Sequence, residues 1–259
     1  MLRNAFAYIT RKWPKSLLLF AIILLMGTLS LIGLSMKGAT QKASSESLGS
    51  ITNSFSMQIN RRTNPGTPRG AGNLRGEDIE KISQVEGITS SIRRINAIAD
   101  ILDHEIIETE ETLQNQSPER AKYFKNTLMV TGVNDSSKED KFVSGAYKLV
   151  QGEHLTDKDK NQILMHEDLA KKNGLKVGDK VRLKSNLYDA DNEKGANETV
   201  EVTIKGLFSG KNQAPLTYAQ ELYEDTLISD LDTAAKLYGN TVQTATYEDA
   251  TFFAKGDQD

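Results

Sequence analysis

The chain has 259 residues, of which 38% are hydrophobic and 26% are charged, and its formal net charge is −3. Most of it is too polar to lie in lipid, while the apolar share suffices for a core, so a polytopic membrane protein, a disordered chain and a collagen-like chain are excluded for this stretch. The sequence contains no cysteine and only three histidines, which excludes disulfides and thiolate zinc sites and leaves little for other metal or triad chemistry.

The first distinct feature is an uncharged run over residues 16–36. These 21 residues would form a helix of about 31 Å, which matches the hydrocarbon core of a bilayer. We therefore expect a transmembrane helix in preference to a cleaved signal peptide, whose apolar core runs only about 7 to 15 residues. Residues 1–15 hold a charge of +4, so the remainder is net −7. Since positive charge stays cytoplasmic, we expect the N-terminus inside the cell membrane and everything after Lys37 outside it.

The residues before this run form a candidate membrane-surface segment. Apolar side chains recur at helical spacing over residues 1–15, as in an amphipathic helix that lies in the cytoplasmic interface. A plain basic flank fits the spacing equally well. If the segment lies in the interface, membrane lipid is its partner, and the anchors at the interface are expected to be Arg11, Lys12, Trp13 and Lys15.

Beyond a polar stalk over residues 37–53, the chain alternates between strand and helix signals. Apolar–polar alternation predicts strands at 54–60, 88–101, 127–133, 162–166, 180–183, 199–205, 226–228 and 250–254. Capping signals predict helices from Glu77 to Val85, over residues 167–173, and from a capping box at Ser229–Asp232 to Tyr238. The polar, acidic residues 104–122 are expected to be an exposed excursion. Because strands alternate with short helices, we expect an α+β (mixed α/β) fold.

Three motifs approach binding or catalytic signatures without completing them. His166-Glu167 opens like a zinc-protease helix, but Ala170 stands where the second histidine is required. Gly206 to Asn212 has three residues between its glycines, where a phosphate-binding loop needs four. The acidic turn Asp189–Gly195 lacks the glycine and the final acid of a calcium loop. No catalytic, cofactor-binding or metal-ligating residue is therefore predicted, and the chain is not expected to be an enzyme.

A basic, Pro- and Gly-rich loop follows the first expected strand and contains Arg61, Arg62, Arg69 and Arg75. The first three of these arginines are candidates for contact with an anionic lipid headgroup or a peptide carboxylate, although a solvated loop is the simpler interpretation. Nucleic acid is not expected as a partner, because the part of the chain outside the membrane is net −7.

Several segments together resemble one family of transport proteins. Val85-Glu86-Gly87-Ile88, with the extended stretch after it, resembles the start of the periplasmic core domain in MacB/FtsX-type ABC transporter permeases. The most specific segment is Gln162 to Leu183, with its run Val177-Gly178-Asp179-Lys180-Val181. The other segments follow in the family's order, namely Leu128–Gly132, Tyr147–Leu155, Val200–Phe208 and Ile228–Gly239. Within the family, Ile51–Gly72 and Thr131–Leu149 look most like a Vex-type peptide exporter permease.

This resemblance implies a permease with one N-terminal span, a MacB-like extracytoplasmic core domain over residues 54–259 and three further spans. It implies as partners a separate ATP-binding subunit, a second permease copy or paralogue, and a peptide-like substrate for efflux. ATP is then bound by the separate subunit, and this chain holds no cofactor. Because the sequence stops at Asp259 without a later hydrophobic run, we expect the N-terminal portion of such a permease, with its core domain incomplete at the C-terminal end.

The order of elements also predicts two lobes in the core domain. A mixed α/β lobe is expected from about 55–133 together with 226–254, interrupted by a mainly β lobe over about 148–208. In the β lobe, Val202 is expected to face the core, while Lys205 faces water.

Two alternatives to the permease remain open from the residues alone. One is a complete single-pass, membrane-anchored protein that binds an extracellular ligand or partner, and the other is an anchored surface hydrolase. Three apolar runs of about 20 residues downstream of position 259 would favour the permease.

Overall fold

The chain forms two compact units, Met1–Asn53 and Ser54–Asp259. The computed structural model describes residues 14, 24, 26–28, 54–60, 62–63, 72–211 and 222–254. In the first unit the described residues are helical. Among the described residues, no helix is both long enough and apolar enough to cross a membrane. Most of the expected transmembrane helix, and all of the expected stalk, lie outside these residues.

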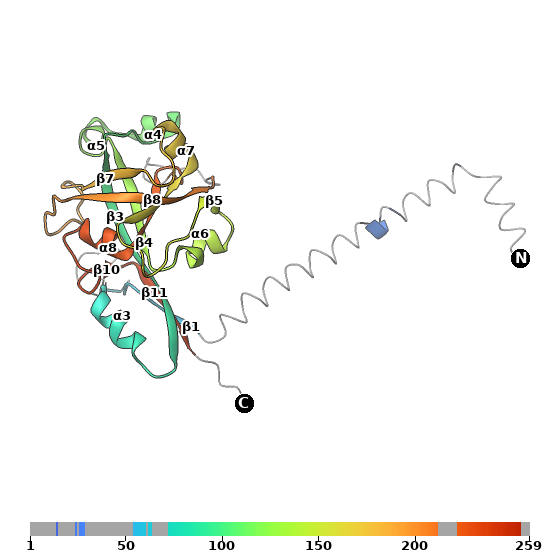
Figure 1. Ribbon diagram of the computed structural model, residues 1–259, viewed down its shortest axis with the longest axis vertical. Helices are drawn as coiled ribbons and strands as arrows, with labels where there is room; N and C mark the ends of the chain where they lie inside the picture. The colour runs from blue at the N-terminus through green and yellow to red at the C-terminus, as the bar shows by residue number, and fades with distance from the viewer. Residues whose placement is uncertain are drawn as a thin grey trace, which may run out of the picture. The chain divides into compact units, whose positions relative to one another are not determined.

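The second unit is built on one large mixed sheet (Figure 1). Its strands are β1 (Ser54–Gln58), β3 (Ile88–Leu102), β4 (Thr127–Val133), β5 (Lys148–Gly152), β6 (Gln162–His166), β7 (Lys180–Ser185), β8 (Thr199–Ser209), β9 (Thr226–Asp230) and β11 (Asp249–Ala254). The short strands β2 (Leu74–Arg75) and β10 (Thr246–Tyr247) pair with each other. The helices of this unit are α3 (Gly76–Ser83), α4 (Glu110–Asn115), α5 (Pro118–Tyr123), α6 (Asp140–Val143), α7 (Glu167–Lys172) and α8 (Leu231–Lys236), with a 3-10 turn at Ser136–Lys138. The mixed α/β class predicted from the sequence is confirmed.

Six of these strands close into a ring. β3 pairs with β4, β4 with β9, β9 with β6, β6 with β8, β8 with β7, and β7 pairs again with β3. Closure depends on the 15-residue length of β3, which pairs with β11 through Ile88–Arg94 and then with β7 through Ala99–Leu102. A closed ring leaves none of its members as an unpaired edge, and a ring of this size is filled by side chains.

The two lobes expected from the sequence are therefore not separate bodies. β3 and β9 of the expected α/β lobe pair with β7 and β6 of the expected β lobe, and residues 54–259 form one compact unit. Backbone pairing between strands far apart in the sequence joins the two lobes that the local sequence pattern suggests are separate.

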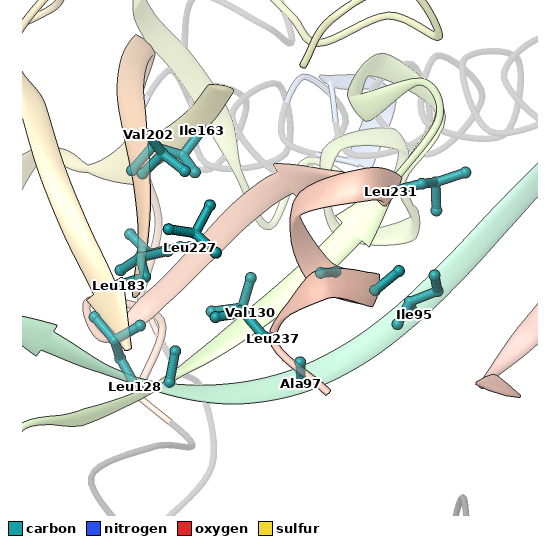
Figure 2. Packing of buried hydrophobic residues seen from close by; sticks show 14 of the residues in the cluster. Ile95, Ala97, Leu128, Val130, Ile163, Leu183, Val202, Leu227, Leu231 and Leu237 are labelled. Atoms are coloured by element: carbon teal, nitrogen blue, oxygen red, sulfur yellow. The ribbon is translucent and has the colours of Figure 1, made fainter. Parts of the chain in front are cut away.

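A large part of the core lies among these strands (Figure 2). Side chains from β3, β4, β6, β7, β8 and β9 gather there, and residues of α3, α8, β2, β10 and β11 belong to the same buried cluster. The alternation in β8 is as predicted, since Val200, Val202 and Ile204 are buried and Glu201 is exposed. Lys205 differs from the prediction, because its side chain is only 18% exposed and pairs with Asp159.

Helix α8 packs against β3 and β4 at this core. Gly132 of β4 permits the close approach, because a Cβ added there would collide with Ala234 of the helix. The N-cap expected at Ser229 is Asp230 instead, whose side chain accepts a hydrogen bond from the Thr233 amide at 2.9 Å. The reason is that β9 continues through Asp230, which places Ser229 inside the strand.

The acidic excursion at 104–122 contains the two short helices α4 and α5. Thr109 and Ser117 cap them through hydrogen bonds from the Thr112 and Arg120 amides, and Pro118 takes the favoured first position of α5. These signals are present in the sequence, but no apolar stripe accompanies them, so periodicity does not reveal the helices.

Candidate functional site

A cleft of about 780 Å³ lies where the two expected lobes meet. Its lining comes from five segments far apart in the sequence: the end of α3 with the start of β3, the residues that end β4, the loop 156–160, the start of α8 and the loop 241–243. Only the loop 156–160 belongs to the expected β lobe. A cleft of this volume is in the range of small-molecule and peptide sites.

Arg93 is the half-buried cation of this cleft. Its Nε donates to the Ser91 hydroxyl at 3.0 Å and its Nη2 donates to the Ser83 hydroxyl at 3.3 Å. Asn134 locks the strand beneath it, accepting from the Arg93 amide at 2.8 Å and donating to the Ser91 carbonyl at 2.7 Å. Burial raises the pKa of the nearby Tyr247 phenol to about 12, and the positive charge of Arg93 opposes that rise. The guanidinium is thus positioned by neutral hydroxyl groups.

The loop 156–160 is held to the sheet by an ion pair. Lys205 Nζ lies 2.8 Å from Asp159 Oδ2, and the two side chains are 18% and 12% exposed. The same carboxylate accepts from the amide and the hydroxyl of Thr156, at 2.7 and 2.9 Å. Burial raises the pKa of Asp159, but Lys205 and Thr156 lower it by more, so it lies below its ordinary value. Asp159 is therefore ionised at neutral pH, and its ion pair with Lys205 holds the loop against β8.

Two further aspartates of the lining have partners of their own within the domain. Asp230 is buried and accepts from the Thr233 amide and hydroxyl and from the Gln162 amide, at 2.9, 2.7 and 2.9 Å. Asp232 forms an ion pair with Lys236 at 2.6 Å. The lining contains no histidine, so the described part of this cleft offers groups for binding and no nucleophile with a histidine base.

A second polar feature, which the sequence analysis does not single out, is a buried acid at the start of β9. Asp225 has no exposed surface, and its Oδ1 accepts from the Ile107 amide at 2.7 Å. Its Oδ2 and Oε2 of Glu224 have no hydrogen-bond partner within the described ranges. Burial, with a smaller contribution from Glu224, raises the pKa of Asp225 to about 8 against the lowering effect of the Ile107 hydrogen bond. Its sequence signal is slight, namely an acidic pair directly before an apolar strand.

The site residues predicted from the sequence lie elsewhere or outside the described chain. Arg11, Lys12, Trp13 and Lys15 are outside the described residues, and so are Arg61 and Arg69. Arg62 is exposed after β1, where its amide donates to the Asn60 side chain at 3.1 Å. Arg75 ends β2 and donates to the Thr244 carbonyl at 3.3 Å. Neither of these described arginines lines the cleft.

The incomplete motifs have structural roles. His166 ends β6 and caps α7, accepting from the Asp168 amide at 3.2 Å through Nδ1. Gly206 lies inside β8, so the run that approaches a phosphate-binding loop begins as strand. Asp189, in the acidic turn, accepts from the Tyr238 hydroxyl. Ser136 contacts His154 Nδ1 at 2.9 Å, but the serine is fully buried and therefore cannot reach a substrate as a hydrolase nucleophile.

The family model of the MacB-like periplasmic core domain matches residues 16–252. The chain therefore belongs to that family, the MacB-like extracytoplasmic domains of ABC-type transporter permeases. This confirms the MacB/FtsX-type resemblance found in the sequence.

Solved structures include two relatives of low identity. The extracellular domain of the noncanonical ABC-type transporter YknZ from Gram-positive bacteria is 13% identical with a TM-score of 0.40, and the match covers 79% of this chain and 83% of that one. The periplasmic region of MacB from Actinobacillus actinomycetemcomitans is 17% identical with a TM-score of 0.45, covering 80% and 77%. No curated protein matches the chain.

Proposed function

We propose that the chain is the N-terminal portion of a permease subunit in an ABC-type exporter of the Vex type, with a peptide-like substrate. In this proposal a separate ATP-binding subunit, together with a second permease copy or paralogue, drives movement of the extracytoplasmic domain. The membership of the MacB-like family supports this role.

The observation that carries the proposal is the position of the two ends of the domain. β1 and β11 pair antiparallel with Ser54 opposite Phe253, so the chain enters and leaves the sheet at the same end (Figure 1). Both strands are joined through β3 to the closed ring. A displacement of the segments before Ser54 and after Ala254 would therefore move the ring and its cleft as one body, as a mechanical transmission requires.

Export by intact cells tests the proposal. Cells that express the full reading frame with its ATPase subunit should release more peptide into the medium than cells without either gene, as measured by mass spectrometry. An ATPase subunit inactivated in its own nucleotide site should abolish the difference. Peptide release that persists with the inactive ATPase contradicts the exporter, and a chain that binds ligand at the cell surface without any effect on release favours the anchored binding protein.

Orientation is tested separately. The charge of +4 on residues 1–15 supports an N-terminus in the cytoplasm, with Arg11, Lys12, Trp13 and Lys15 at the membrane interface. Trypsin added to protoplasts should then digest the chain from Lys42 onward and spare Lys15. Protection of the large domain from trypsin would show the opposite orientation.

A further inference from the structure

Two neighbouring arginines of β3 differ in whether a carboxylate pairs with them. Arg94 pairs with Asp249 and, at 3.3 Å, with Asp140. Arg93, on the other face of the strand, has only neutral side-chain partners in the described part of the chain, the hydroxyls of Ser83 and Ser91 and the phenol of Tyr247. No carboxylate of the described residues lies within 4.0 Å of its nitrogens. A half-buried guanidinium that lacks a counter-ion keeps N–H groups free for an anion, which it binds best in the bidentate geometry of a carboxylate.

The other charges of the cleft leave Arg93 as its fixed cation. Asp159 is paired with Lys205 and Asp232 with Lys236, while both oxygens of the buried Asp230 accept from Thr233 and Gln162. Lys160 and Asp157 also line the cleft, but both are exposed and solvated. An anionic group that enters the cleft therefore meets one rigid, partly desolvated positive charge, where electrostatic attraction is stronger than at the surface.

The remaining lining fits a peptide. Hydroxyl and amide side chains, such as Ser90, Thr241 and Gln243, can bond to a peptide backbone, and apolar side chains, such as Ile88 and Val242, can cover its side chains. A phosphate dianion fits less well, because its second charge has no further half-buried cation to pair with in the described lining, where Lys160 is exposed. Lipid acyl chains would have to lie against this mostly polar lining.

We infer that this cleft is a peptide-binding site in which Arg93 receives a carboxylate of the ligand. The ligand class rests on the proposed function, whereas the assignment of Arg93 rests on the structure of the cleft. Arg93 is then a specificity-determining residue that selects peptides with a free C-terminus or an acidic side chain. Asn134 and Ser91 act as positioning residues, since they hold the strand and the guanidinium beneath the ligand.

The experiment measures retention of peptides by the full chain, purified in detergent and immobilised. The probes are a pool of random octapeptides with free C-termini and the same pool with amidated C-termini, both read by mass spectrometry. The wild type should retain carboxylate-bearing peptides about tenfold or more above the Arg93→Gln variant, as expected for loss of a charge-assisted hydrogen bond. Arg75→Gln is the matched control, because it removes the same charge from an arginine outside the cleft.

Each result decides the inference. Loss of retention on amidation assigns the terminal carboxylate, and amidated peptides retained only when they carry Asp or Glu assign a side-chain carboxylate. The inference is overturned if neither pool is retained, or if retention ignores both amidation and acidic residues. It is also overturned if Arg93→Gln abolishes binding to phosphatidylglycerol vesicles but not to peptides. Should Arg93→Gln fail to fold, the comparison of the two pools on the wild type still decides.

Failure of this inference and failure of the exporter are separable. Retention that depends on Arg93, combined with no ATPase-dependent release, contradicts the exporter alone. ATPase-dependent release that Arg93→Gln leaves unchanged, without retention of either pool, contradicts the cleft assignment alone.

Discussion

Asp159 and Asp225 are both shielded from solvent in the same domain, but their charges are met in different ways. Asp159 lies 2.8 Å from the ammonium of Lys205, and its pKa is below the ordinary value. Asp225 has one backbone donor, the Ile107 amide, and its burial raises the pKa to about 8. Burial alone therefore does not set the charge of a carboxyl group here. The partner decides whether the acid works as an ion or is held as a neutral group.

The largest loss of stability is expected from an acid placed where it has neither a cation nor a backbone amide as a partner. Val202→Asp puts a carboxylate into the closed ring among apolar side chains, and it should cost several kcal/mol of the free energy of unfolding. Thr203→Asp, on the opposite face of β8, should cost well under about 1 kcal/mol. Urea unfolding of the two variants of the full chain checks this pair, and equal losses would contradict the assigned faces of the strand.

Replacement of the buried Asp225 by asparagine should increase the free energy of unfolding by an amount that depends on pH. A carboxyl with a raised pKa stabilises the fold below its unfolded pKa, and this contribution is lost as the pH rises through about 8. At about 1.4 kcal/mol for each pKa unit, Asp225→Asn should gain a few kcal/mol over the wild type at pH 9 and little at pH 5. Thermal unfolding from pH 5 to 9 measures the difference. Asp78, whose side chain is 47% exposed, gives the control Asp78→Asn, and the same pH profile for both variants would refute the buried acid.

The ion pair between Lys205 and Asp159 can be tested in the same way by removal of the lysine charge. Lys205→Met leaves Asp159 with Thr156 alone, and the protein should lose about 2 kcal/mol at neutral pH. Because the pKa of Asp159 is lowered in the folded state, its contribution is present above the ordinary aspartate pKa and disappears as the pH falls through the lowered value. The loss should therefore shrink toward pH 3. Lys180→Met breaks the exposed pair with Glu201 and should cost well under about 1 kcal/mol.

The sequence predicts the apolar part of this domain better than its polar part. The alternation in β8 and the acids and lysines of α7 identify their elements directly, because local spacing determines which face is buried. Closure of the ring is not visible locally, because β3 must pair with β7 across about 80 positions of the chain. The single unit follows from that pairing.

The cleft and the buried acid escape sequence reasoning for a related reason. Arg93 and the loop 156–160 become neighbours only through the fold, and an arginine in a strand reads as an ordinary polar-face residue. Asp225 precedes a short apolar strand, where an acid is usually exposed. The interface anchors and two of the three arginines predicted for ligand contact lie outside the described residues, so they stay predictions.

The carboxylate of Asp189 is stabilised in a third way, by the hydroxyl of Tyr238. Removal of this hydroxyl should have the smallest effect on stability. Tyr238 donates its hydroxyl to Asp189 Oδ2 and accepts the Ile98 amide at 3.0 Å, which ties the acidic turn to β3. Burial and the adjacent carboxylate raise the pKa of Tyr238, so the phenol stays protonated as a donor. Tyr238→Phe should cost about 1 kcal/mol, because the amide and the carboxylate each lose one partner while Asp189 keeps the Asp191 amide. Tyr188→Phe, at a ring that is 59% exposed, should leave the urea midpoint unchanged. If both substitutions shift the midpoint equally, the hydroxyl of Tyr238 does not join the turn to the ring.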